Sequence, residues 1–151
     1  IGREHDLNEA ARLRNLVTQA DLDSRIHLVG ELSAEELKKD YARATFFALA
    51  TRYEGHGLVF DEALVHGLPI VSCRAGAVPD TVPEEAGLLV PPDDPNTFAD
   101  ALRHMLSQPD AYARFSEAAR AAGQALPAWS ETAQTVSTVL NQVPLTSAGP
   151  R

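Results

Sequence analysis

Short runs of apolar residues alternate along this chain with stretches that carry apolar residues at helical spacing. The runs predict four buried strands, at 26–29, 45–50, 69–73 and 87–90. The periodic stretches predict helices at 6–20, 33–43, 58–66, 94–106, 110–126 and 130–142. Strands that alternate with helices of this length indicate an α/β fold. We therefore expect a Rossmann-like, mostly parallel sheet that is flanked by helices.

Local signals mark several of the predicted boundaries. Ser33-Ala34-Glu35-Glu36 matches a capping box, which predicts a helix start. Asp94-Pro95 matches an N-cap that is followed by proline at the first helical position. Gly67 fits the position just past the end of the 58–66 helix. The run at 45–50 is continuous rather than alternating, which predicts a strand covered on both faces.

Composition restricts the classes of partner. The 151 residues are 44% hydrophobic and 23% charged, as in an ordinary globular domain. A net charge of −8 argues against a nucleic-acid partner, which requires a basic face. The single cysteine, Cys73, has no internal disulfide partner, which favours a reducing, cytoplasmic setting. No apolar run approaches the roughly 20 residues that a membrane helix requires.

The start of the chain leads to an expectation about its extent. It opens at Ile1-Gly2 without an initiator Met, and this pair is similar to a strand end with its turn. We expect residues 1–143 to form a partial domain whose preceding strands are missing, and 144–151 to form a disordered tail. A sheet without its central strand exposes backbone edges and apolar surface. The chain alone is therefore expected to be poorly stable or to self-associate.

Residues 53–63 combine a strand end, a Gly-x-Gly turn and a helix start. Gly55 and Gly57 allow a ligand to approach the backbone, and the free N–H groups of the helix start favour an anion. Glu62, about one turn into the helix, is placed to reach a ligand hydroxyl. Because the segment follows a strand, it is expected at the carboxyl edge of the sheet, where ligands bind in such folds. It predicts a site for a nucleotide or a sugar phosphate.

Four segments, in this order, resemble the carboxyl-terminal, donor-binding domain of the family 4 (group 1) glycosyltransferases, which are retaining enzymes of GT-B fold. They are 54–63, 67–71, 76–80 and 87–90, and the first holds the E-x7-E pair. The resemblance extends from about residue 1 to residue 129. It implies transfer of a hexosyl group, with retention, from a nucleotide-diphosphate sugar of the UDP or GDP type. It implies neither a bound metal nor another cofactor.

The resemblance assigns roles to side chains by position. Glu54 matches the glutamate near the transferred sugar, where a carboxylate supports an oxocarbenium-like transition state. Glu62 matches the glutamate that binds the ribose hydroxyls, and a carboxylate is suited to accept two hydrogen bonds. Glu31 and Leu32 match the loop whose backbone holds the base.

Backbone roles carry over in the same way. Gly55, His56 and Gly57 match the turn that contacts sugar hydroxyls and the distal phosphate. The amides of Leu58 and Val59 match the donors to the diphosphate, which gains negative charge as the leaving group. His56 departs from the family, which often has Phe there. It adds a titratable group that either tunes donor preference or is a neutral filler.

Other departures leave alternatives open. The family's Arg and Lys diphosphate clamp would precede Ile1, and its acceptor domain is not in this chain either. That domain would bind a sugar, lipid or small-molecule acceptor, with peripheral membrane contact as an option, in polysaccharide, glycolipid or small-glycoside synthesis. Ala77 and Asp80 replace the usual Gly and Glu. A nucleotide-binding or interaction domain without catalysis therefore remains the alternative.

Two further classes are disfavoured. Residues 55–60 lack the third glycine of the dinucleotide-binding fingerprint, which argues against a dehydrogenase. No lysine is placed for a pyridoxal cofactor, and the E-x7-E match favours transfer, which together argue against a GT-B-fold epimerase or phosphorylase. No His/Cys/Asp cluster has the spacing of metal ligands, and Asp93-Asp94 is interpreted as a helix cap.

Overall fold

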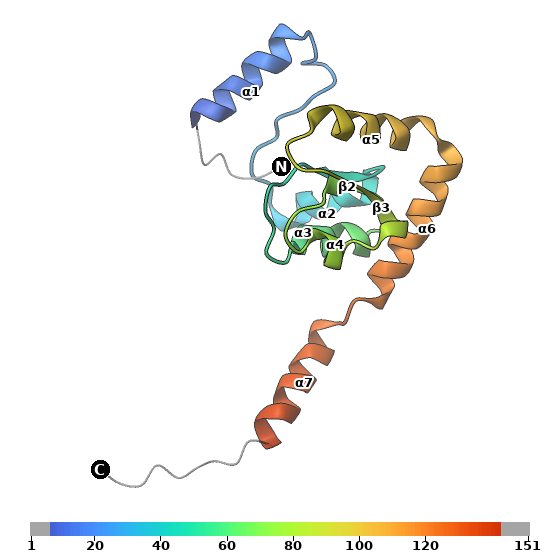
Figure 1. The fold of residues 1–151 in the computed structure, drawn as a ribbon. Helices are drawn as coiled ribbons and strands as arrows, with labels where there is room; N and C mark the ends of the chain where they lie inside the picture. Colours follow the sequence, from blue (N-terminus) through green and yellow to red (C-terminus); the bar gives the residue numbers. More distant parts are fainter. Residues whose placement is uncertain (1–6, 143–151) are drawn as a thin grey trace. The chain divides into compact units, whose positions relative to one another are not determined.

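A computed structural model describes residues 7–142 of the chain (Figure 1). The chain divides into two compact units, Ile1–Ala44 and Thr45–Arg151, which are described separately. The first contains α1 (Leu7–Gln19) and α2 (Ala34–Arg43). The second contains β1 (Phe47–Leu49), α3 (Leu58–Val65), β2 (Ile70–Cys73), α4 (Val78–Thr81), the 3₁₀ helix η1 (Glu84–Ala86), β3 (Gly87–Val90), α5 (Pro95–Ser107), α6 (Pro109–Ala125) and α7 (Trp129–Gln142). The grouping of residues 1–143 into one domain stays a prediction, and the predicted tail lies outside the described residues.

Both helices of the first unit were predicted. The capping box at the start of α2 is present: the Glu36 N–H donates to Ser33 Oγ at 3.3 Å, and the Ser33 N–H donates to Glu36 Oε2 at 3.0 Å. The Ser33 hydroxyl also donates to Glu36 Oε2 at 2.6 Å, and this hydrogen bond, followed by the one from the Ser33 N–H, lowers the pKa of Glu36. Tyr41 is buried and Leu37 is half-buried, as predicted for this face of α2. In α1 no residue is buried.

The strand predicted at 26–29 is wrong. These residues form no strand, and Ile26, Leu28 and Val29 are each more than 40% exposed. A strand is held by hydrogen bonds to a neighbouring strand. Among the described residues, the three strands that form a ladder all belong to the second unit. An apolar run without a partner strand therefore remains irregular here.

The second unit is built on a three-stranded parallel sheet in the order β1-β2-β3. Phe47 pairs with Ile70, and Ile70 pairs with Gly87, so the strands begin in register. Parallel strands require long crossover connections. The first crossover contains α3, and the second contains α4 and η1, which were not among the predicted helices. The predicted α/β fold with a parallel sheet is confirmed.

Helices cover both faces of this sheet (Figure 1). On one face, Val71 and Cys73 of β2 pack in a buried cluster with Ala101 and Met105 of α5. On the other, the rings of Phe47 in β1 and Phe60 in α3 meet edge to face, with centroids 5.8 Å apart. Burial of a side chain such as Phe60 contributes about 1.5–3 kcal/mol. The core is thus a layered one, with β2 at its centre.

β2 is buried at every position, but β1 is not. Phe47 and Leu49 are half-buried, and Ala48, which points to the opposite face, is exposed. α5 packs mainly on β2 and β3. The face of β1 that carries Ala48 is therefore left without a helix over it. The prediction that the strand at 45–50 is covered on both faces is therefore wrong.

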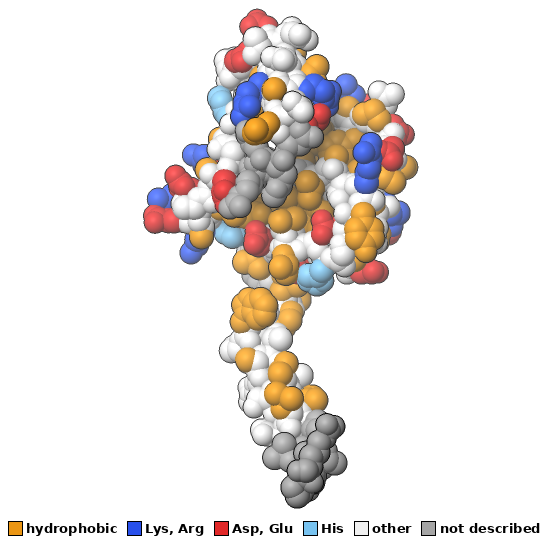
Figure 2. All heavy atoms as spheres, turned by 90° about the vertical axis from the view of Figure 1, so that its left-hand side faces the viewer, with side chains coloured by type: hydrophobic (Ala, Val, Ile, Leu, Met, Phe, Trp, Pro, Cys, Tyr) orange, Lys and Arg blue, Asp and Glu red, His pale blue; other side chains and the backbone are white. Residues whose placement is uncertain are grey.

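The last three helices agree with the predicted ranges to within one residue at every end. α5 begins at the predicted cap, where Asp94 Oδ1 accepts from the Thr97 N–H at 3.0 Å and Asp94 Oδ2 accepts from Thr97 Oγ1 at 2.6 Å. α6 packs against α3. α7 has no buried residue and displays hydrophobic side chains along its length (Figure 2). Within residues 7–142, no helix combines the length and apolarity needed to cross a membrane.

Candidate functional site

The turn between β1 and α3 lies at the carboxyl edge of the sheet, as predicted. Gly57 is the N-cap of α3, with φ 77° and ψ 52°, a left-handed conformation that favours glycine. A Cβ at Gly57 would lie 2.6 Å from the Phe60 ring and 2.9 Å from Glu54 Cγ. Gly55 has open space around it. Of the two glycines in the turn, the fold therefore requires Gly57.

A second loop holds the backbone of Glu54. The Ala77 N–H donates to the Glu54 carbonyl at 2.9 Å. Gly76, just before it, has φ 54°, and a Cβ there would lie 2.2 Å from the same carbonyl oxygen. Glu54 is half-buried in this arrangement. The motif segments that contain Glu54 and Gly76 are thus packed together at the edge of the sheet.

His56 makes two contacts that fix it in the turn. Its ring Nε2 lies 3.2 Å from Asp61 Oδ2 in the first turns of α3. Its carbonyl accepts from Thr81 Oγ1 at 2.8 Å. The His56 ring itself is exposed. Neither Asp61 nor Thr81 was a predicted site residue, and Asp61 had one signal: an acid near a helix start, where the dipole favours it.

The first amides of α3 have no hydrogen-bond acceptor within residues 7–142. Leu58 and Val59 occupy the first two helical positions, whose N–H groups have no intrahelical partner. Among the described residues, no hydrogen bond is made by the N–H groups of Gly55, Gly57, Leu58 or Val59. The Phe60 N–H, by contrast, donates to the Gly57 carbonyl at 2.8 Å. Four N–H groups without a partner in the described chain therefore lie within a short stretch, at one turn and the helix start that follows it.

Glu62 lies in the second turn of α3, and its side chain is exposed. Its carbonyl accepts from the His66 N–H at 3.3 Å and contacts the His66 ring Nδ1 at 2.9 Å. The helix therefore carries Glu62 on the same turn-and-helix unit as Glu54 and the free amides.

The remaining predicted site residues, Glu31 and Leu32, belong to the first unit. They lie in the irregular segment before α2, where Glu31 is exposed and Leu32 is half-buried. Their assignment to the base of a nucleotide stays a prediction.

An open hollow of about 840 Å³ lies at the carboxyl ends of β1 and β2. Arg52, after β1, and Asp93, after β3, form an ion pair on its wall, with Arg52 Nε 2.6 Å from Asp93 Oδ1. The carboxylate raises the pKa of Arg52. Both side chains are exposed, so the pair links two edge loops but adds little stability.

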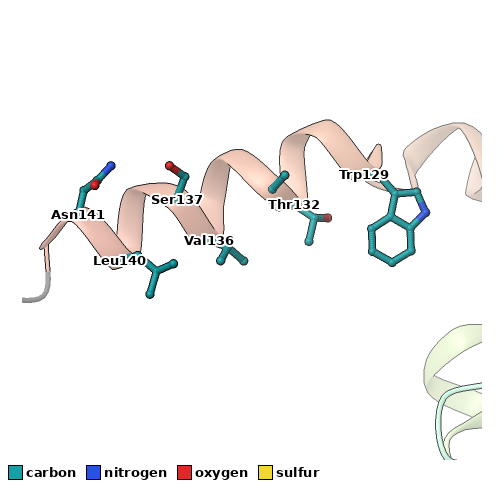
Figure 3. A pocket seen from close by; sticks show the side chains of 7 residues that line it. Trp129, Thr132, Val136, Ser137, Leu140 and Asn141 are labelled. Carbon is teal, nitrogen blue, oxygen red and sulfur yellow. The ribbon is translucent and has the colours of Figure 1, made fainter.

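A second hollow, of about 530 Å³, runs along α7 (Figure 3). All of its lining residues come from that one helix, and none is titratable; they include Trp129, Val136 and Leu140. This hollow therefore has no acid, base or metal ligand among its lining side chains. In the described part of the chain, no group of three or more His, Cys, Asp or Glu side chains is arranged to hold a metal ion.

The sequence of this chain matches a known protein family. Residues 1–122 match the model of the glycosyl transferases group 1. The D-inositol 3-phosphate glycosyltransferase of Corynebacterium efficiens is 33% identical over 130 residues, which are 85% of this chain and 30% of that protein. The chain thus spans about 30% of the length of this curated relative.

Solved structures show the same fold. The carboxyl-terminal domain of the group 1 glycosyl transferase LpcC from Francisella tularensis superposes with a TM-score of 0.71 at 27% identity, covering 78% of this chain and 61% of that one. HepE of Anabaena, in complex with UDP and glucose, superposes with a TM-score of 0.80 at 21% identity, covering 93% of this chain and 39% of that one. This chain belongs to the group 1, or family 4, glycosyl transferases, and its fold is that of the carboxyl-terminal domain of these GT-B enzymes.

Proposed function

We propose that the turn between β1 and α3 is the donor site of a retaining hexosyltransferase that uses a nucleotide-diphosphate sugar. The observation that carries this proposal is the start of α3, where four backbone N–H groups are free and two glutamates flank them. Membership of the family supports glycosyl transfer as the activity. The UDP in the HepE structure supports a UDP-type donor, with GDP as the other candidate.

The amides at the start of α3 suit the leaving group. When the bond between the anomeric carbon and the diphosphate breaks, its electrons remain on the diphosphate. Oriented N–H groups and the positive end of the helix dipole stabilise that charge. Leu58 and Val59 supply the helical donors, and Gly55 and Gly57 supply those of the turn. Gly55 also leaves space for the sugar, because it has no side chain and no neighbour within 4 Å of where a Cβ would stand.

The two glutamates have different surroundings and therefore different roles. Glu54 is half-buried beside Gly57 and Gly76, which fixes its position next to the reacting sugar. A carboxylate there stabilises the positive charge that develops on the sugar ring. Glu62 is exposed on α3 and accepts hydrogen bonds from the ribose hydroxyls. The reaction runs in the cytoplasm, the reducing setting that the lone, free Cys73 favours.

The proposal is tested by thermal unfolding of the full chain with UDP, GDP and ADP. A ligand at a hundred times its dissociation constant adds about 2.7 kcal/mol of stability. For a chain of this size that is a shift of several degrees in the midpoint. Glu62→Ala is expected to abolish the shift. Glu117→Ala, which removes an exposed glutamate from α6, is the matched control and is expected to keep it.

Turnover of the sugar conjugate by the whole protein separates the two glutamates. Glu54→Gln keeps the shape of the side chain but removes the charge, so it is expected to bind UDP while losing transfer. Full turnover by Glu54→Gln and Glu62→Ala together with unchanged nucleotide binding would rule out this site. The alternative, a nucleotide-binding domain without catalysis, predicts the midpoint shift and no transfer by the wild-type protein.

A further inference from the structure

Two carbonyl groups in the turn between β1 and α3 accept hydrogen bonds from the crossover between β2 and β3. The Glu54 carbonyl accepts from the Ala77 N–H at 2.9 Å. The His56 carbonyl accepts from Thr81 Oγ1 at 2.8 Å. The two acceptors are separated by one residue in the turn, and both donors lie at the α4 segment. The crossover is therefore joined to the turn by two hydrogen bonds.

A held carbonyl also orients the N–H group on the far side of its peptide bond. The peptide group is planar and trans, so its C=O and N–H point in opposite directions. Since the Glu54 and His56 carbonyls point toward α4, the N–H groups of Gly55 and Gly57 point away from it. These two N–H groups make no hydrogen bond among the described residues. The orientation of these two N–H groups thus depends on hydrogen bonds donated by Ala77 and Thr81, which lie outside the turn.

The residue on the far side of each held bond is glycine, which rotates more freely than any other residue. Without the contact from Thr81, the peptide between His56 and Gly57 is free to turn and present its carbonyl oxygen where an N–H is needed. An oxygen there repels a phosphate instead of binding it. The hydrogen bond from the Thr81 hydroxyl favours the orientation in which the His56 carbonyl faces α4 and the Gly57 N–H faces away from it.

We propose that Thr81 is a positioning residue of the donor site, which acts through the His56–Gly57 peptide to aim the Gly57 N–H at the donor diphosphate. This inference rests on the proposed function. Thr81 is half-buried, and its hydroxyl also lies 3.2 Å from the Ala77 carbonyl one turn back in α4. The shorter contact is the one to His56, 25 positions away in the chain.

The test compares Thr81→Val, which keeps the shape but removes the hydroxyl, with Thr81→Ser, which keeps the hydroxyl. Both are made in the full chain, and the UDP dissociation constant is measured by calorimetry beside the unfolding midpoint without ligand. Thr81→Val is expected to weaken UDP binding roughly tenfold, the effect of losing one hydrogen bond. Thr81→Ser is expected to restore it. A merely structural role would lower the midpoint of Thr81→Val without this pattern of loss and rescue.

Thr135→Val is the matched control. Its hydroxyl donates to a carbonyl one turn back in α7 at 3.0 Å, away from the turn in sequence, and its loss is expected to leave UDP binding unchanged. If Thr81→Val does not fold, Thr81→Ala takes its place, with the same expected weakening. Equal UDP affinity in wild type and Thr81→Val would overturn the inference alone, as would Thr81→Ser binding as weakly as Thr81→Val. If the wild type binds neither UDP nor GDP, the proposed function and this inference both fail.

Discussion

Gly76 lies directly against the backbone of Glu54. A Cβ at Gly76 would stand 2.2 Å from the Glu54 carbonyl oxygen and 2.9 Å from its nitrogen. No real Cβ makes such contacts, and both partners are backbone atoms that cannot rotate away. The φ of 54° at Gly76 adds a second reason for glycine. The position of Glu54 therefore depends on the absence of a side chain 22 residues later.

The first prediction is that Gly76→Ala lowers the unfolding midpoint and weakens UDP binding together, because the turn that carries Glu54 has to move. The left-handed backbone alone costs about 1–2 kcal/mol, and the clash adds to it. Thermal unfolding with and without UDP measures both effects. Gly55→Ala is the control for stability, because nothing lies within 4 Å of its Cβ position. Equal midpoints for the two variants would contradict the prediction.

The second prediction concerns the contact between α6 and α3. A Cβ at Gly123 would lie 2.1 Å from the Leu64 carbonyl oxygen. Helix propensity alone would make Gly123→Ala more stable by about 1 kcal/mol. We expect the opposite sign, a loss of about 1–3 kcal/mol, because the two helices are forced apart. Urea unfolding gives the value, and Ala121→Gly, at an exposed position of α6, shows what propensity contributes by itself.

The third prediction is that the buried hydroxyl of Ser72 stabilises the sheet. Ser72 is fully buried, and its Oγ donates to the Leu49 carbonyl of β1 at 2.7 Å. Ser72→Ala is expected to cost about 1 kcal/mol in denaturant unfolding. Ser116→Ala is the comparison, because its contact with the Gly67 carbonyl is longer, at 3.4 Å, and weaker. If Ser116→Ala lost more unfolding free energy than Ser72→Ala, the shorter distance would not mark the stronger hydrogen bond, and the prediction would be wrong.

The fourth prediction is a pH dependence that originates at the cap of α5. Hydrogen bonds from the Thr97 hydroxyl, and then from its N–H, lower the pKa of Asp94 below its ordinary value of 3.8. Because the folded state has the lower pKa, the stabilisation is present above about pH 4 and is lost as the pH falls through the folded pKa. Asp94→Asn keeps a capping oxygen but does not titrate. The difference in unfolding free energy between the two proteins is expected to be constant near neutral pH and to shrink in acid. Parallel curves down to about pH 2 would contradict this assignment.

Features that depend on near neighbours in the chain were predictable. The capping box joins Ser33 to Glu36, and the cap of α5 joins Asp94 to Thr97, each across three positions. Gly57 needs only its own backbone conformation to start α3. The alternation of apolar runs and helical stretches was likewise enough to predict a parallel α/β fold.

Strand pairing was less predictable, because it depends on a partner that the apolar run does not specify. Residues 26–29 resemble 87–90 in composition, yet only the latter find a neighbour, in β2. Ala48 in β1 is exposed for a related reason, since α5 packs on β2 and β3. Both errors concern what covers or pairs with a strand.

The sequence by itself determined the fold class, the boundaries of the longer helices and the strand–turn–helix unit that carries Glu54, Gly57 and Glu62, because each is set by periodicity, caps or backbone preference within a few residues. Only the tertiary structure decided how that turn is held. Thr81 contacts His56, which lies 25 positions earlier in the chain, and Gly76, in the crossover between β2 and β3, contacts Glu54. Such contacts arise when parallel strands bring their carboxyl ends to one edge, and no local pattern encodes which loop residues then touch.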